Sequence, residues 1–195
     1  EHFSIWSLIK NVNKSDIEEV IITASGGPFL NLAISKFSKI KPSSAIKHPN
    51  WNMGKKISID SATMMNKVFE VIEAQRIFNI ELKKFKILVH PDSYVHSIIK
   101  FNNGITKILV HDTNMKIPIF NTLYQNSDKK LVCKKLNITK LNNLNFKNID
   151  EKRFPTVNIL NYVSKKSSLY ETVIVSANDL LVDLFLDGKI KFLDI

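Results

Sequence analysis

Cysteine is almost missing from the sequence: Cys133 is the only one among 195 residues, so no disulfide can form within the chain. Long apolar runs are missing too, since none approaches the roughly 20 residues that span a bilayer. The first residues lack the basic region and apolar region of a signal peptide. We therefore expect a protein of a reducing compartment, with the cytoplasm as its location and with no membrane partner.

Arginine is also scarce, although the formal net charge is +10. Arg76 and Arg153 are the only arginines, so lysine carries nearly all of the positive charge. Recognition of bases and bidentate binding of phosphates favour arginine, and no basic run is interleaved with stacking aromatic residues. We interpret the charge as solvated lysines and expect no nucleic-acid partner.

The remaining composition is that of a globular protein, with 44% hydrophobic and 24% charged residues. A short apolar run from Glu18 ends at the Gly26-Gly27 pair, which predicts a strand that leads into a loop. The segment FKILVH, residues 85–90, predicts a buried strand. Residues 96–112 contain Asn-Asn-Gly between two apolar runs, which is a strong hairpin signal. These elements predict a small mixed β-sheet.

Helices and loops complete the predicted α/β fold. Residues 28–56 are polar and interrupted by proline, which favours a long active-site lid loop. Residues 58–79 show the apolar spacing of one helix, and the pattern after Phe154 is helical again, with Pro155 near a start and Gly188 near an end. We therefore predict a domain over 1–125 that binds metal and substrate, a linker over 126–151, and the start of an α-helical domain over 152–195.

The segment HPNWNMGKKISIDSATMMNK, residues 48–67, has many small polar and charged side chains in one place. In a helix from Ser58, Ser61 lies in the first turn, where free N–H groups and the helix dipole favour an anion. Thr63, Lys67 and Glu70 then share one face. These residues alone favour an ordinary surface helix with a Lys67–Glu70 ion pair over a site for phosphate and a divalent cation.

Three motifs shift that balance: TASGGPF, the segment from His48 followed by Glu70, and HPDSYVHS. Together, and in this order, they resemble 1-deoxy-D-xylulose 5-phosphate reductoisomerase, and the resemblance extends over essentially the whole chain. It implies an NADPH-dependent oxidoreductase and isomerase with a bound Mn²⁺ or Mg²⁺ ion, Co²⁺ being an alternative. The implied reaction converts 1-deoxy-D-xylulose 5-phosphate to 2-C-methyl-D-erythritol 4-phosphate in isoprenoid biosynthesis.

The resemblance also implies roles for individual residues. Glu1 and Glu70 correspond to metal ligands and, with His48, to catalytic residues that contact the substrate. The groups that hold the substrate and its phosphate correspond to Ser25, Ser61, Asn66 and Lys67. Trp51 corresponds to an indole of the lid that covers the substrate. Gly54 and Met53 correspond to positions beside NADPH, and His96 corresponds to a supporting histidine near the site.

The chain also departs from the family pattern. The NADPH-binding domain and the remaining metal ligand should precede Glu1, so we expect this fragment to be inactive alone. The family implies a homodimer, to which the hairpin at 96–112 could contribute, and a plastid stroma as the location if the source is eukaryotic. Two alternatives stay open: a related reductase acting on another sugar phosphate, and a module that binds a phosphorylated ligand without redox activity.

Overall fold

The computed structural model describes residues 1–48, 53–125, 127–164 and 168–195. These residues form two compact units, each assembled from separate stretches of the chain. The first unit combines Glu1–Ser25 with Phe78–Asn148, and the second combines Gly26–Ile77 with Ile149–Ile195. These two units differ from the predicted domains, which were divided at residues 125 and 151. The predicted division stays a prediction.

The first unit is built on a five-stranded mixed sheet with the order β4-β3-β1-β2-β5. Strands β1 and β2 pair in parallel, whereas the other three pairs are antiparallel. The predicted α/β fold with a small mixed sheet is confirmed. The strands are β1 (Ile17–Ala24), β2 (Phe85–Val89), β3 (Val95–Phe101), β4 (Thr106–Val110) and β5 (Lys147–Asn148).

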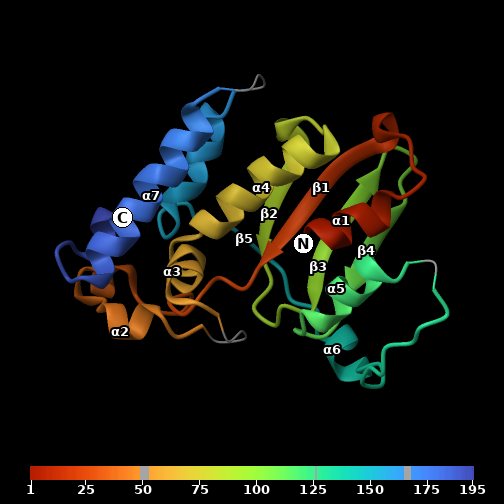
Figure 1. Ribbon diagram of the computed structural model, residues 1–195, viewed down its shortest axis with the longest axis horizontal. Coiled ribbons are helices and arrows are strands. Elements are labelled where there is room, and N and C mark those ends of the chain that lie inside the picture. The colour runs from red at the N-terminus through yellow and green to blue at the C-terminus, as the bar shows by residue number, and fades with distance from the viewer. Residues whose placement is uncertain (49–52, 126, 165–167) are drawn as a thin grey trace. The chain divides into compact units, whose positions relative to one another are not determined.

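The predicted hairpin is present as β3 and β4, joined through the Asn-Asn-Gly segment. Gly104 has φ of 85°, a conformation that glycine adopts without strain. Helix α1 (His2–Ile9), which was not predicted from the sequence, lies over β3 and β4 and buries Ile5 completely (Figure 1). Helix α5 (Lys116–Leu123) follows β4 and contacts α1. The β3–β4 part of the sheet is therefore covered by α1.

The end of the predicted linker belongs to this sheet. Helix α6 (Ile138–Asn142) and β5 both lie within residues 126–151, and β5 pairs with β2. The ring of Phe146 stacks on that of His90, with 4.9 Å between the ring centroids. Nδ1 of His90 lies 2.8 Å from the carbonyl oxygen of Asn145, so it donates to that oxygen. These contacts fix the chain at the sheet edge.

The second unit is mainly helical. Its α-helices are α2 (Pro42–Ala45), α3 (Lys55–Thr63), α4 (Met65–Phe78) and α7 (Tyr170–Leu186). The last residue of α4, Phe78, is counted with the first unit. Its 3₁₀ segments are η2 (Ile34–Lys39), η4 (Pro155–Tyr162) and η5 (Phe192–Asp194); η1 (Lys14–Asp16) and η3 (Leu82–Lys84) belong to the first unit. The predicted proline start and glycine end are confirmed at Pro155 and Gly188.

An aromatic cluster forms the core of the second unit. Phe29, Phe185 and Phe192 are buried and meet edge to face, with ring centroids 5.4 Å and 5.8 Å from Phe192. Such contacts add to the energy of apolar burial. Phe37 from η2 joins the same cluster. The expectation of an irregular loop over residues 28–56 is therefore wrong in part, because η2, α2 and the start of α3 lie in it and bury apolar side chains.

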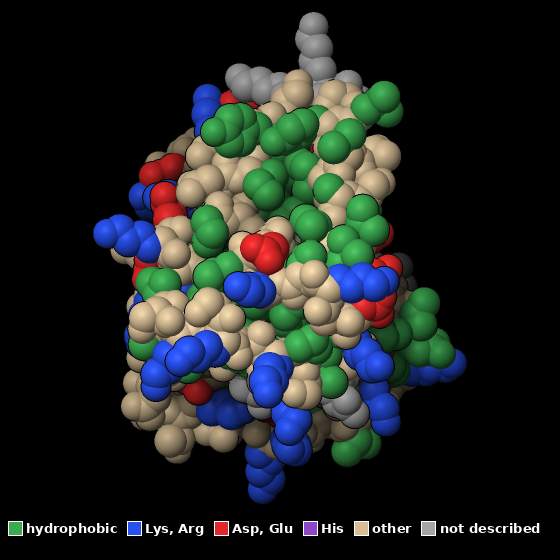
Figure 2. Space-filling model, turned by 90° about the vertical axis from the view of Figure 1, so that its left-hand side faces the viewer, with side chains coloured by type: hydrophobic (Ala, Val, Ile, Leu, Met, Phe, Trp, Pro, Cys, Tyr) green, Lys and Arg blue, Asp and Glu red, His purple; other side chains and the backbone are tan. Residues whose placement is uncertain are grey.

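Helix α7 carries apolar side chains both on the face that packs on this core and on its exposed surface. Figure 2 shows apolar side chains gathered on the face of the second unit that carries α7. Val173, Val175 and Leu180 of this helix are exposed, the first to 61%. Among the described residues, no helix is both long and apolar enough to cross a lipid bilayer.

Candidate functional site

The polar segment that the sequence singled out forms two helices instead of one. Helix α3 begins at Lys55, after the N-cap residue Gly54, and ends at Thr63, and α4 begins at Met65. Ser61 therefore lies in the last turn of α3, so the prediction that it occupies the first turn of a helix is wrong. Asn66 and Lys67, by contrast, lie in the first turn of α4.

Met64 makes the break between the two helices. Its φ of 69° places it in the left-handed region, which non-glycine residues adopt at an energetic cost. The hydroxyl group of Thr63 accepts a hydrogen bond from the N–H of Met65 at 3.3 Å. The hydroxyl group of Thr156, in η4, donates to the carbonyl oxygen of Thr63 at 2.5 Å. Both side chains satisfy backbone groups that the break removes from regular helix hydrogen bonding.

The conformation and close packing of the loop after β1 explain why it contains two glycines, Gly26 and Gly27. Both have positive φ, 87° and 67°, and both are buried. A Cβ atom on Gly27 would lie 2.7 Å from the carbonyl oxygen of Ser61 and 2.9 Å from Cα of Ala62. The loop backbone thus packs directly against the last turn of α3, and no side chain fits between them.

Lys67 and Glu70 form a buried ion pair on α4, with 2.7 Å between Nζ and Oε2. The side chains are only 8% and 14% exposed. The amide of Asn66 donates to the other carboxylate oxygen, Oε1, at 2.5 Å. The predicted Lys67–Glu70 pair is present, but it is not an ordinary surface pair, because a solvated pair would keep its side chains in water.

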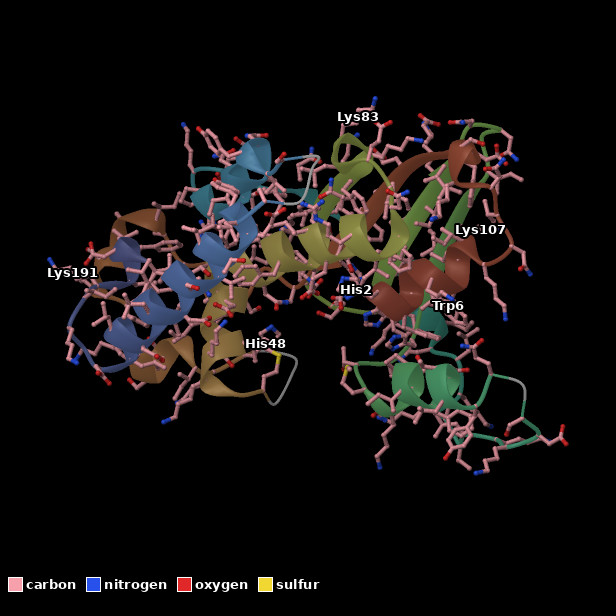
Figure 3. The ribbon with its side chains drawn as sticks, turned by 45° about the horizontal axis from the view of Figure 1, so that its top comes forward. His2, Trp6, His48, Lys83, Lys107 and Lys191 are labelled. Atoms are coloured by element: carbon pink, nitrogen blue, oxygen red, sulfur yellow. The ribbon has the colours of Figure 1, made fainter. Side chains whose placement is uncertain are left out.

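His48 lies on the loop between α2 and α3 and is half-buried (Figure 3). Burial lowers the pKa of its imidazole, and the positive charge of Lys67 lowers it further. The ring is therefore neutral at neutral pH and can donate one hydrogen bond and accept another. His48, Asn66, Lys67 and Glu70 thus form one electrostatically connected group, the α4 cluster, within the second unit.

Three further predicted residues lie on the segment before α3. Gly54 is exposed, and a Cβ atom on it would meet nothing within 4 Å. No contact within the described residues therefore requires glycine there. Met53 is partly buried beside it. Trp51 lies outside the described residues.

Glu1, Ser25 and His96 belong to the first unit. Glu1 precedes α1 and is half-buried, and Ser25 directly follows β1. His2 and Trp6 extend from α1 (Figure 3). His96 is buried and stacks on His111, with 3.7 Å between the ring centroids and 16° between the ring planes. Burial and the neighbouring His111 lower the pKa of His96 to about 4, so it is uncharged at neutral pH.

The predicted metal ligands fit a divalent cation by their chemistry. Mg²⁺ and Mn²⁺ prefer carboxylate oxygens, which Glu1 and Glu70 supply. In the described part of the chain, no group of three or more His, Cys, Asp or Glu side chains is arranged to hold a metal ion. The two glutamates belong to different compact units.

Sequence reasoning missed the contacts of Asp60 in α3. Asp60 is 3% exposed and accepts a hydrogen bond from Asn178 of α7 at 2.8 Å. Lys56 lies 2.8 Å from the other oxygen of Asp60 and 3.0 Å from Asp179. The only available signal was a charged residue among apolar positions of a predicted helix, which does not identify its partner.

The chain is thus an α/β protein in which a lysine, an amide and a carboxylate meet at the start of α4, near a neutral histidine. Comparisons with known proteins are more specific. Residues 1–78 match the family profile described as "1-deoxy-D-xylulose 5-phosphate reductoisomerase C-terminal domain", and residues 111–195 match "DXP reductoisomerase C-terminal domain". The chain belongs to the 1-deoxy-D-xylulose 5-phosphate reductoisomerase family.

Individual relatives agree with this assignment. The 1-deoxy-D-xylulose 5-phosphate reductoisomerase of Pelagibacter ubique (strain HTCC1062) is 64% identical over all 195 residues, which are 50% of its own length. A Zymomonas mobilis reductoisomerase in complex with NADPH matches with a TM-score of 0.90 and 38% identity over 100% of this chain and 50% of the other. A DOX-P reductoisomerase in complex with NADPH, fosmidomycin and magnesium matches with a TM-score of 0.88 and 32% identity, over 99% of this chain and 50% of the other. The chain spans about half the length of the curated relatives it matches.

Proposed function

We propose that this chain is the catalytic part of an NADPH- and divalent-metal-dependent reductoisomerase that converts 1-deoxy-D-xylulose 5-phosphate to 2-C-methyl-D-erythritol 4-phosphate in isoprenoid biosynthesis. The observation that carries the proposal is the α4 cluster. An ion pair that is largely removed from water seldom adds net stability, so its presence at a helix start favours a binding or catalytic role over a purely structural one. Relatives solved with NADPH and with magnesium support the choice of cofactors.

The phosphate of the substrate is assigned to the start of α4 and its surroundings. Lys67 supplies a positive charge, Asn66 supplies amide hydrogens, and the helix dipole adds its positive end. Ser61 and Ser25 are assigned hydroxyl contacts, as the family resemblance implies. Binding the phosphate away from the reacting carbons provides energy for orienting the substrate and closing the site.

His48 and Glu70 are assigned to the reacting end of the substrate. A neutral His48 can donate a hydrogen bond to a substrate oxygen without adding a second positive charge beside Lys67. The carboxylate of Glu70, held in place by Lys67 and Asn66, is assigned to the metal together with Glu1. When bound, Mn²⁺ or Mg²⁺ supplies Lewis acidity toward the oxygens of the sugar. Trp51 is assigned to cover the substrate and exclude water.

The cofactor is assigned to the segment before α3. Because a Cβ atom on Gly54 meets nothing in the described residues, the space above it is open to a ligand. Close approach of NADPH to the backbone there would account for glycine at this position, with Met53 beside the nicotinamide. We also propose a homodimer, manganese as the working metal and the cytoplasm as the location.

The test uses the complete natural protein that carries this sequence. It is incubated with 1-deoxy-D-xylulose 5-phosphate, NADPH and Mn²⁺, and the product is identified by nuclear magnetic resonance. The proposal predicts NADPH oxidation matched by formation of the branched product 2-C-methyl-D-erythritol 4-phosphate. Turnover of a different sugar phosphate would instead favour the related reductase. Phosphate binding without any NADPH oxidation would favour the binding module.

A further inference from the structure

A buried hydrogen bond joins helix α3 to helix α7, far from it in the sequence. Oδ1 of Asp60 accepts from Nδ2 of Asn178 at 2.8 Å, across 118 residues of sequence. The two residues are 3% and 5% exposed, and both belong to the second compact unit. Asp60 immediately precedes Ser61, one of the residues assigned to the substrate phosphate.

Lys56 completes this contact on the other side of the carboxylate. Its Nζ lies 2.8 Å from Oδ2 of Asp60 and 3.0 Å from Oδ1 of Asp179, the residue next to Asn178. Both oxygens of Asp60 are therefore engaged by charged or strongly polar donors. A buried carboxylate with one partner removed would be strongly destabilising, so the geometry between α3 and α7 is closely specified.

A second contact holds the same helix at its end. The Thr156 hydroxyl group donates to the carbonyl oxygen of Thr63, where α3 stops at the left-handed Met64. Gly27 packs against Ser61 and Ala62 from another direction. The break at Met64 sets the direction in which α4 starts. Thr156, Gly27 and Asn178, from three distant parts of the sequence, hold the helix that leads into it.

Apolar side chains at this contact would give similar or better stability, because a buried ion cluster seldom adds net stabilisation. Charge-assisted hydrogen bonds add directional specificity instead. We propose that Asn178 and Asp60 are positioning residues that hold α3, and through the Met64 break the start of α4, in the orientation that binds the substrate phosphate. This inference rests on the proposed function of the α4 cluster, and it assigns neither residue a contact with the substrate.

The test exchanges the two side chains. In Asn178→Asp two carboxylates face each other in a buried place, so α3 shifts away from α7. In the double variant Asp60→Asn, Asn178→Asp the donor and acceptor are exchanged, so the hydrogen bond can form again with the opposite polarity. Asp183→Asn, at an exposed position of α7, is the control for a one-unit change of charge on the same helix.

Two readouts in the complete protein decide the outcome. The KM for 1-deoxy-D-xylulose 5-phosphate should rise about 10-fold or more in Asn178→Asp, the loss expected from one charge-assisted hydrogen bond. The Kd for NADPH should stay at the parent value. Amide hydrogen exchange should rise in the peptide that covers residues 61–68. The exchanged pair should restore both readouts to within about 3-fold, and Asp183→Asn should change neither.

The inference is overturned if folded Asn178→Asp keeps the parent KM and exchange rates. It is also overturned if the exchanged pair melts at the parent temperature without recovering KM. Should the parent fail to turn over the sugar phosphate, the proposed function fails. Hydrogen exchange at residues 61–68 still decides whether Asn178 and Asp60 position the start of α4.

Discussion

Nζ of Lys67 lies 2.7 Å from Oε2 of Glu70, three residues further along helix α4, and both side chains are almost fully removed from water. The second oxygen of Glu70 accepts from the amide of Asn66. This carboxylate is thus held in one orientation, which suits a ligand for a hard divalent cation.

Lys67→Met should lower the free energy of unfolding by about 3 kcal/mol, because it leaves the Glu70 carboxylate buried beside an apolar side chain. The double variant Lys67→Met, Glu70→Gln should regain most of that loss. Denaturant titration measures both. Lys189→Met, which breaks the exposed pair with Asp187, serves as control and should cost about 0.5 kcal/mol or less. Equal losses at both lysines would contradict a special role for the buried pair.

Gly27→Ala should destabilise the protein more than Gly104→Ala does. Both positions have positive φ, so both variants bear a backbone strain of about 1 kcal/mol. Only at Gly27 would the added Cβ atom meet backbone, 2.7 Å from the Ser61 carbonyl oxygen. The difference between the two urea midpoints isolates this steric contact. Similar midpoints would show that the loop can move away from α3 at little cost.

Stability should fall in acid because His96 is buried as a neutral ring. Its pKa is lowered from 6.5 to about 4, so below pH 6.5 the unfolded chain binds a proton that the folded chain does not. The contribution of His96 to the free energy of unfolding is fully present above pH 6.5. It is lost at up to about 1.4 kcal/mol per pH unit toward pH 4, and it does not change further below pH 4. His96→Asn should remove this part of the slope in metal-free buffer.

The groups that face His96 are His111 and Glu1, together with the amino group of Glu1 where that residue begins the chain. Burial lowers the pKa of His111 as well, so His96→Asn should retain a weaker dependence from that ring. A variant whose unfolding free energy follows the parent curve between pH 6.5 and 4 would show that His96 does not carry the effect.

Gly54→Ala should weaken NADPH binding without unfolding the protein. The φ and ψ of Gly54, −61° and 162°, are open to alanine, and the added methyl group meets no described atom. Loss of the glycine N-cap should cost about 1 kcal/mol or less. The Kd for NADPH, measured by fluorescence in the complete protein, should rise several-fold. An unchanged Kd would remove Gly54 from the cofactor site.

Local sequence signals predicted the strands and the hairpin well, because Asn-Asn-Gly between apolar runs has one favourable local solution. The Lys67–Glu70 pair could be predicted for the same reason, since i, i+3 spacing on a helix brings side chains together. The resemblance to a family supplied the site residues, which composition and spacing alone did not.

The break at Met64 could not be predicted. Thr-Met-Met contains no glycine or proline, and the strained residue is stabilised by Thr156 and by the loop at Gly27, both remote in the sequence. Treating residues 58–79 as one helix therefore misplaced Ser61. The Asp60–Asn178 contact escaped prediction in the same way, because no local pattern couples residues 118 positions apart.

The most direct test of Glu70 as a metal ligand in a reductoisomerase is NADPH oxidation with 1-deoxy-D-xylulose 5-phosphate as Mn²⁺ is varied. The complete protein and its Glu70→Gln variant are compared, with NADPH binding as the check on folding. The parent should require the metal, and the variant should lose about 100-fold or more in turnover while still binding NADPH. A Glu70→Gln variant with parent turnover at the same Mn²⁺ concentration would contradict the assignment.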